Sequence, residues 1–127
     1  MTTRCRWGTA CLMVSLCRAA LSGSPVVAED FESGKLVGWT CTDPNAFRIA
    51  DGDRGKCLEL FQKPDYSPKV RSPLGLAILD SPVLSDFVFD VRLRSTVKDY
   101  GHRDLCLVFG YQDPEHFYYV HFGKKAD

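Results

Sequence analysis

The chain has 127 residues, enough for one domain with a buried core and too few for two. With 45% hydrophobic and 25% charged residues, the composition is that of a globular protein. The formal net charge is zero, which argues against nucleic acid or an acidic membrane surface as a partner.

Residues 1–28 have the features of a secretory signal peptide: a basic start, an apolar middle and small residues before the expected cleavage after Ala28. Residues 29–127 would then form the mature domain, secreted or periplasmic. Arg18 interrupts the apolar run, and the alternative is an N-terminal extension without structure. The run is shorter than the roughly 20 residues that a membrane-spanning helix needs, so no span is predicted.

Cysteine usage predicts at most one disulfide in the mature domain. Of six cysteines, Cys41, Cys57 and Cys106 follow the predicted leader, and three is an odd number. Cys41 and Cys57 are the only local candidate pair, and Cys106 is predicted to be a small core residue. No cysteine pair has zinc-ligand spacing, and the turn at 51–55 has too few carboxylates for calcium. The sequence therefore predicts no metal and no cofactor.

From residue 30 onward, short apolar runs alternate with turn residues, which is the pattern of β-strands. A strand is predicted at 37–41, and two more flank the turn sequence DGDRG at 51–55. Three prolines predict a loop at 63–75, and another short strand follows at 76–85. No segment has a helical period.

The stretch SDFVFDVRLRST, 85–96, gives the clearest strand prediction, because its side chains alternate over eight residues. An apolar set faces a core and a second set faces water. The apolar set is Phe87, Phe89, Val91 and Leu93, and the second set is Val88, Asp90, Arg92 and Arg94.

The stretch CLVFGYQDPEHFYYVHFG, Cys106–Gly123, predicts two strands joined by a short turn. On the first strand, strict alternation places Leu105, Leu107, Phe109 and Tyr111 on one face. On the second, it predicts that Tyr118, Val120 and Phe122 join the core. Phe117, Tyr119 and His121 then lie on the outer face.

Three motifs, DFESGKLVGW, SDFVFDVRLRS and LVFGYQDPEHFYYVHFG, occur in this order. Together they resemble the concanavalin A-like jelly roll, and most closely the bacterial exported 3-keto-disaccharide hydrolase-like (family 16 glycoside hydrolase-like) domains. The resemblance covers about residues 30–123. It implies an all-β sandwich of two antiparallel sheets. The chain would be incomplete at its C-terminus, because it stops at GKKAD without closing strands.

The resemblance also implies a carbohydrate-binding or glycan-processing module. Family 16 glycosidases carry a Glu-x-Asp-x-x-Glu type of motif, and no such string occurs here. A glycoside hydrolase or a polysaccharide lyase therefore stays open as a class, with no assignable catalytic residue.

Two groups of residues are candidates for binding the sugar. Asp90, Arg92, Tyr119 and His121 lie on predicted outer faces, where rings stack on sugars and charged groups bind hydroxyls. The alternative interpretation is that these side chains form ordinary cross-strand pairs on a sheet. The second group is His102, Arg103 and Asp104, whose side chains together suit binding to a sugar hydroxyl or a carboxylate. The alternative for this segment is a solvated turn with a local Arg–Asp pair. His102, Tyr119 and His121 also fit proton abstraction in a lyase.

The alternative function is a non-catalytic adhesion or scaffolding domain with the same fold and no sugar site. The hairpin that ends at Phe122 is predicted to leave an open sheet edge, and such an edge favours self-association. The two functions differ in whether the predicted site residues converge on one exposed face.

Overall fold

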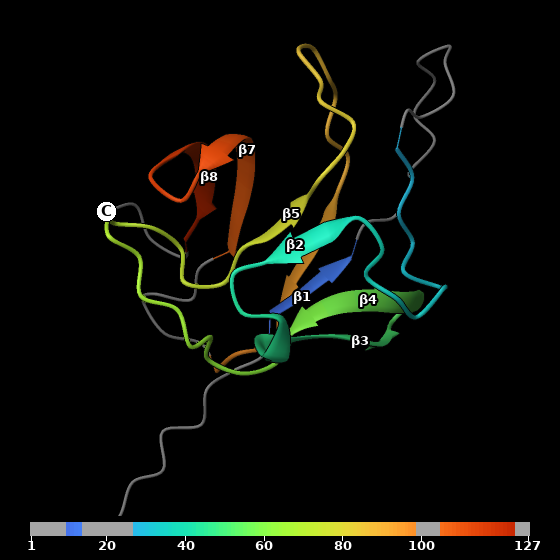
Figure 1. Cartoon of the computed structure of the whole chain (residues 1–127). Helices are drawn as coiled ribbons and strands as arrows, with labels where there is room; N and C mark the ends of the chain where they lie inside the picture. Colours follow the sequence, from blue (N-terminus) through green and yellow to red (C-terminus); the bar gives the residue numbers. More distant parts are fainter. Residues whose placement is uncertain (1–9, 14–26, 99–104, 124–127) are drawn as a thin grey trace, which may run out of the picture.

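The computed structural model describes residues 27–98 and 105–123, and the backbone course of 10–13. Within these ranges the protein is all-β, with a single 3₁₀ turn and no α-helix (Figure 1). No helix among them is long and apolar enough to cross a membrane. The elements are β1 (Ala10–Met13), β2 (Trp39–Cys41), η1 (Pro44–Ala46), β3 (Phe47–Gly52), β4 (Gly55–Leu60), β5 (Ala77–Leu79), β6 (Arg92–Ser95), β7 (Leu105–Asp113) and β8 (His116–Phe122).

The largest sheet has four antiparallel strands in the order β3-β4-β1-β6. The β3–β4 hairpin confirms the predicted turn. Gly52 pairs with Gly55, which leaves Asp53 and Arg54 as a two-residue loop. Gly55 has φ 98°, a conformation that glycine adopts without a steric penalty. A strand from the segment predicted to be a leader, β1, lies between β4 and β6.

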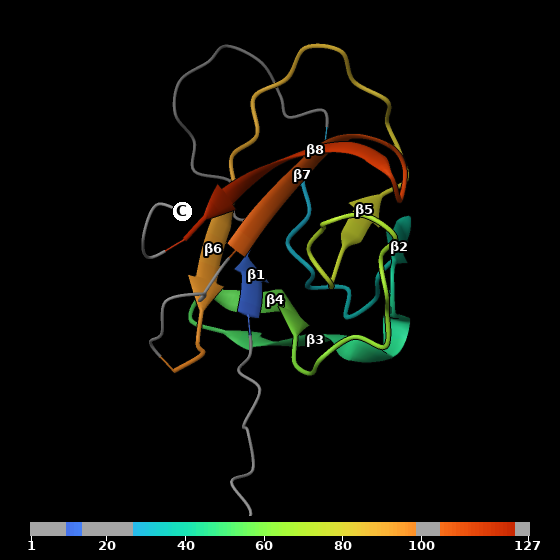
Figure 2. The same cartoon turned by 90° about the vertical axis from the view of Figure 1, so that its left-hand side faces the viewer.

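The described residues form two smaller sheets as well, and each is an antiparallel pair. β2 pairs with β5, and β7 pairs with β8. The β7–β8 hairpin arches over the four-stranded sheet, while β2 and β5 stand at one end (Figure 2). The proline-rich stretch between β4 and β5 contains no strand, as the sequence predicts.

The buried core is small and lies near β4. Its apolar members are Phe31, Ala46, Cys57, Leu58 and Leu76. The Phe31 ring packs against Trp39, with ring centroids 5.8 Å apart. Nearby, a Glu32 carboxylate oxygen accepts a hydrogen bond from the Lys56 backbone N–H at 2.7 Å. This contact ties the stretch before β2 to the β3–β4 hairpin.

The predicted strand at 85–96 is shorter in the structure than its alternation indicates. Only Arg92–Ser95 forms a strand, β6, because its ladder partner is the four-residue β1. Residues 86–91 run without a ladder, and Phe87 and Phe89 are half exposed. Alternation in the sequence therefore does not guarantee a partner strand.

The candidate pair Cys41–Cys57 does not form a disulfide. Cys41 is a free thiol, whereas Cys57 is disulfide-bonded elsewhere. The two residues belong to different sheets, since Cys41 ends β2 and Cys57 lies on β4. Burial, followed by the nearby Asp80 carboxylate, raises the pKa of the Cys41 thiol. The thiol therefore stays protonated at neutral pH and reacts slowly.

Candidate functional site

The β7–β8 hairpin contains a β-bulge that changes which rings share a face. Phe109 pairs with Tyr118, and the register then shifts so that Asp113 pairs with His116. Gly110 lies in this shift with φ 58°. Between these two pairs β7 advances four residues and β8 two, and the Tyr111 ring packs against Phe117, on the face opposite Phe109. The prediction that Tyr111 shares a face with Phe109 is therefore wrong, because strict alternation does not hold through a bulge.

Past the bulge, three rings form a continuous row, which we call the aromatic row: Tyr111, Phe117 and Tyr119. The centroids of Tyr111 and Phe117 are 5.9 Å apart, and those of Phe117 and Tyr119 are 6.1 Å apart. Tyr111 and Phe117 are partly buried, whereas Tyr119 is 39% exposed. His121, two residues further along β8, is exposed on the same face.

The aromatic row offers ring surface together with hydroxyl groups. Burial, and then the nearby Tyr66 and Asp113, raise the pKa of the Tyr111 phenol. The phenol is therefore protonated at neutral pH and can donate a hydrogen bond. The row ends at an exposed tyrosine and an exposed histidine, so a ligand can reach it from that end.

The turn of the hairpin is held by two sets of polar contacts. Asp113 Oδ1 accepts from the Glu115 backbone N–H at 2.8 Å, and the same carboxylate contacts His116 Nδ1 at 2.9 Å. These contacts, led by the backbone hydrogen bond, hold the pKa of Asp113 below its ordinary value. Lys69 forms an ion pair with Glu115 at 2.8 Å, which fastens the loop before β5 to the turn.

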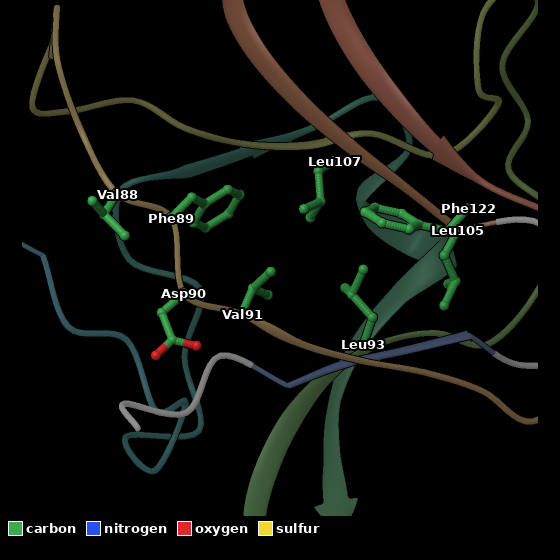
Figure 3. Close-up of a pocket in the computed structure, with 8 residues that line it drawn as sticks. All are labelled: Val88, Phe89, Asp90, Val91, Leu93, Leu105, Leu107 and Phe122. Carbon is green, nitrogen blue, oxygen red and sulfur yellow. The ribbon is translucent and has the colours of Figure 1, made fainter. Parts of the chain in front are cut away.

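The other face of the hairpin forms an open apolar cleft of about 660 Å³ over the segment 88–93 (Figure 3). Aliphatic and aromatic side chains meet from the two sides, and the Asp90 carboxylate turns away from them. The lining residues are Val88, Phe89, Asp90, Val91, Leu93, Leu105, Leu107 and Phe122.

Three residues predicted to join the core lie on this open face. Tyr118 is 66% exposed, Val120 46% and Phe122 47%. Their facing, opposite to Phe117 and Tyr119, agrees with the prediction, but their burial does not. These side chains face the cleft, but the cleft is open to solvent and therefore does not bury them.

The structure does not bring the predicted sugar-binding residues together. Asp90 borders the apolar cleft, and Arg92 lines a separate hollow beside the β3–β4 turn. Tyr119 and His121 lie on the opposite face of the hairpin from the cleft. Convergence on one concave face is thus not observed for these four. The second predicted group, His102, Arg103 and Asp104, lies outside the described residues.

Tyr111 and Phe117 are the members of the site that sequence reasoning missed. The available signal was Gly110, because an isolated glycine within a strand pattern indicates a bulge. In 27–98 and 105–123, no group of three His, Cys, Asp or Glu side chains is placed to hold a metal ion.

A scan against protein-family models and searches of curated proteins and of solved structures find no significant match to this chain.

Proposed function

We propose that this chain is an exported carbohydrate-binding domain whose sugar site is the aromatic row together with His121. The observation that carries the proposal is the spacing of three neighbouring rings on one sheet face, ending at the exposed Tyr119. A concanavalin A-like sandwich, implied by the resemblance, belongs to the same proposal, as does the leader at residues 1–28.

The chemistry of sugars supports this choice of face. A pyranose has an apolar C–H face that packs against an aromatic ring, and its hydroxyls need donors and acceptors nearby. The aromatic row supplies ring surface, while the Tyr111 and Tyr119 hydroxyls and His121 supply polar groups. The apolar cleft is less suited to a sugar, because its one charged side chain, Asp90, turns away from it.

The proposal is one of binding, without a catalytic step. A glycosidase needs two carboxyl groups that flank the scissile bond. Beside the aromatic row the nearby acid is Asp113, and its oxygens are engaged by Glu115 N–H and His116. We therefore assign no catalytic residue.

A glycan-array screen of the full chain, followed by titration of the best glycan, tests the proposal. Tyr119→Ala removes the exposed ring, and we expect at least about a tenfold loss of affinity, the order of one to two aromatic contacts. Val83→Ala, at an almost fully exposed apolar position outside the hairpin, is the matched control and should bind normally. Absence of any glycan ligand, or equal binding by Tyr119→Ala, would refute the proposal.

A second candidate, assembly through a second copy of the chain, is favoured by the apolar cleft. Phe122 and Phe89 expose about half of their surface there, and β8 has one edge without a ladder partner in the described structure. Sedimentation of the parent and of Phe122→Ser distinguishes the two. A concentration-dependent dimer that Phe122→Ser converts to monomer supports assembly, and a monomeric parent contradicts it.

A further inference from the structure

A hollow of about 570 Å³ on the four-stranded sheet is lined by three arginines, and we call it the arginine hollow. Arg92 and Arg94 come from β6, two residues apart and therefore on the same face. Arg54 and Asp53 come from the β3–β4 turn. The turn lies beside β6 (Figure 2), and Arg94 Nη1 meets Asp53 Oδ1 across the gap.

The charges around the arginine hollow do not balance. Three arginines and one aspartate leave a formal charge of +2. Asp53 forms an ion pair with Arg94, whereas the Arg54 and Arg92 side chains have no hydrogen-bond or ion-pair partner in the described part of the chain.

An arginine elsewhere on the same sheet face has a carboxylate partner. Arg94 and Glu59 are both cross-strand neighbours of position 11 on β1, and Glu59 pairs with Arg48. The Arg48 guanidinium forms an ion pair with Glu59. The Arg48 charge on this face is therefore compensated, whereas the arginine hollow keeps an excess of positive charge.

We propose that the arginine hollow binds an oxyanion, a phosphate or sulfate group carried free or as a substituent of a larger ligand. Guanidinium groups present paired N–H donors that match the oxygens of such anions, and these charge-assisted hydrogen bonds are stronger than neutral ones. Arg54 and Arg92 bind the anion directly. The Asp53 carboxylate partly neutralises Arg94 and thereby lowers the affinity of the hollow for an anion. This site is separate from the aromatic row and does not depend on sugar binding there.

Calorimetric titration of the full chain with inorganic phosphate and with inorganic sulfate, at constant ionic strength, measures the binding. We expect a dissociation constant of about 1–10 mM, the range for a few exposed charge-assisted contacts. A sulfated disaccharide and its unsulfated parent distinguish the source of the anion. Preference for the sulfated disaccharide over free sulfate indicates a substituent, and equal affinity indicates a free ion.

Four variants test the site, and a melting curve of each confirms that it folds. The proposal predicts weaker anion binding for two of them, stronger binding for one and unchanged binding for the control. Arg92→Gln and Arg54→Gln should each weaken phosphate binding about tenfold, the scale of one charged hydrogen bond. Asp53→Asn should strengthen it several-fold, because it releases Arg94. Lys35→Gln, in an exposed loop outside the hollow, removes the same charge and should leave binding unchanged.

Three outcomes would overturn the proposal. They are no heat of binding for either anion, normal binding by Arg92→Gln, and equal weakening by Lys35→Gln. Equal weakening by Lys35→Gln would show that the anion responds to the net charge of the protein and does not bind at the arginine hollow.

Discussion

Two adjacent tyrosines on β8 lie in different surroundings. Tyr119 continues the aromatic row, whereas Tyr118 points to the open cleft face and stacks on Phe109 with ring centroids 5.7 Å apart. Their difference comes from the two-residue period of a strand. Each tyrosine can therefore be removed without touching the other face.

Tyr118→Ala should cost little stability. The side chain is mostly exposed, so the main loss is its stacking on Phe109, about 0.5–1.5 kcal/mol for an aromatic pair. Phe31→Ala, at a fully buried ring, should cost about 3–5 kcal/mol. Urea unfolding of both variants measures the difference. A loss for Tyr118→Ala as large as that for Phe31→Ala would show that the cleft is closed in solution.

Asp113 should make the hairpin turn sensitive to acid. The pKa of the Asp113 carboxyl is lowered in the folded state from its ordinary value of 3.8, so the charged carboxylate stabilises the fold at pH values above 3.8. That contribution is lost as the pH falls from this value through the folded-state pKa. We expect the Glu115 amide resonance to shift with the Asp113 titration, below pH 3.8. Asp113→Asn should abolish this shift, and a midpoint at or above 3.8 in the parent would contradict the account.

At the scale of elements, Gly110 decides which side chains the hairpin presents. Its positive φ accompanies the bulge, and the bulge places Tyr111 beside Phe117. A Cβ at this position would lie 3.2 Å from Tyr118 Cδ2. The aromatic row therefore depends on a residue that has no side chain of its own.

Gly110→Ala should lower stability by about 1–2 kcal/mol, the cost of a left-handed conformation for alanine, and should weaken glycan binding by displacing Tyr111. Gly34→Ala is the matched control. Gly34 has φ 70° with open space around it, so Gly34→Ala should lower stability through the same backbone strain. Its glycan affinity should stay unchanged. Melting curves and glycan titrations compare them. Equal glycan affinity for both variants would show that the bulge does not support the site.

The elements differ in how far the sequence predicts them. The hairpin at Phe47–Leu60 was predictable, because Asp-Gly and Gly residues encode its turn locally. The strand at 85–96 was predicted too long, because a ladder depends on a distant partner that alternation does not identify. In the candidate site, Tyr119 and His121 were predicted on the correct face. The bulge hid Tyr111, because strict alternation of side chains does not hold within it.

At the scale of the whole molecule, β1 joins two parts of the largest sheet. It hydrogen-bonds to β4 on one side and β6 on the other. Cleavage after Ala28, expected for an exported chain, would remove this strand. N-terminal sequencing of the exported protein shows directly which form exists outside the cell.

A chain that begins at Glu29 should be less stable than one that begins at Ala10. Without β1, the facing edges of β4 and β6 lose their ladder, and we expect a melting temperature lower by at least about 5 °C, the effect of roughly 1 kcal/mol in a domain of this size. Thermal unfolding followed by circular dichroism compares the two chains. Identical melting curves would show that β1 contributes nothing to the sheet.

The central claim is that a glycan binds on the aromatic row, and ring resonances test it most directly. The full chain, labelled with ¹³C in its phenylalanine and tyrosine rings, is titrated with the best glycan from the array and followed by NMR. The account predicts that the resonances of Tyr111, Phe117 and Tyr119 shift, while those of Phe109 and Tyr118 on the opposite face stay in place. Shifts confined to Phe109 and Tyr118, or no ring shift at saturating glycan, would contradict it.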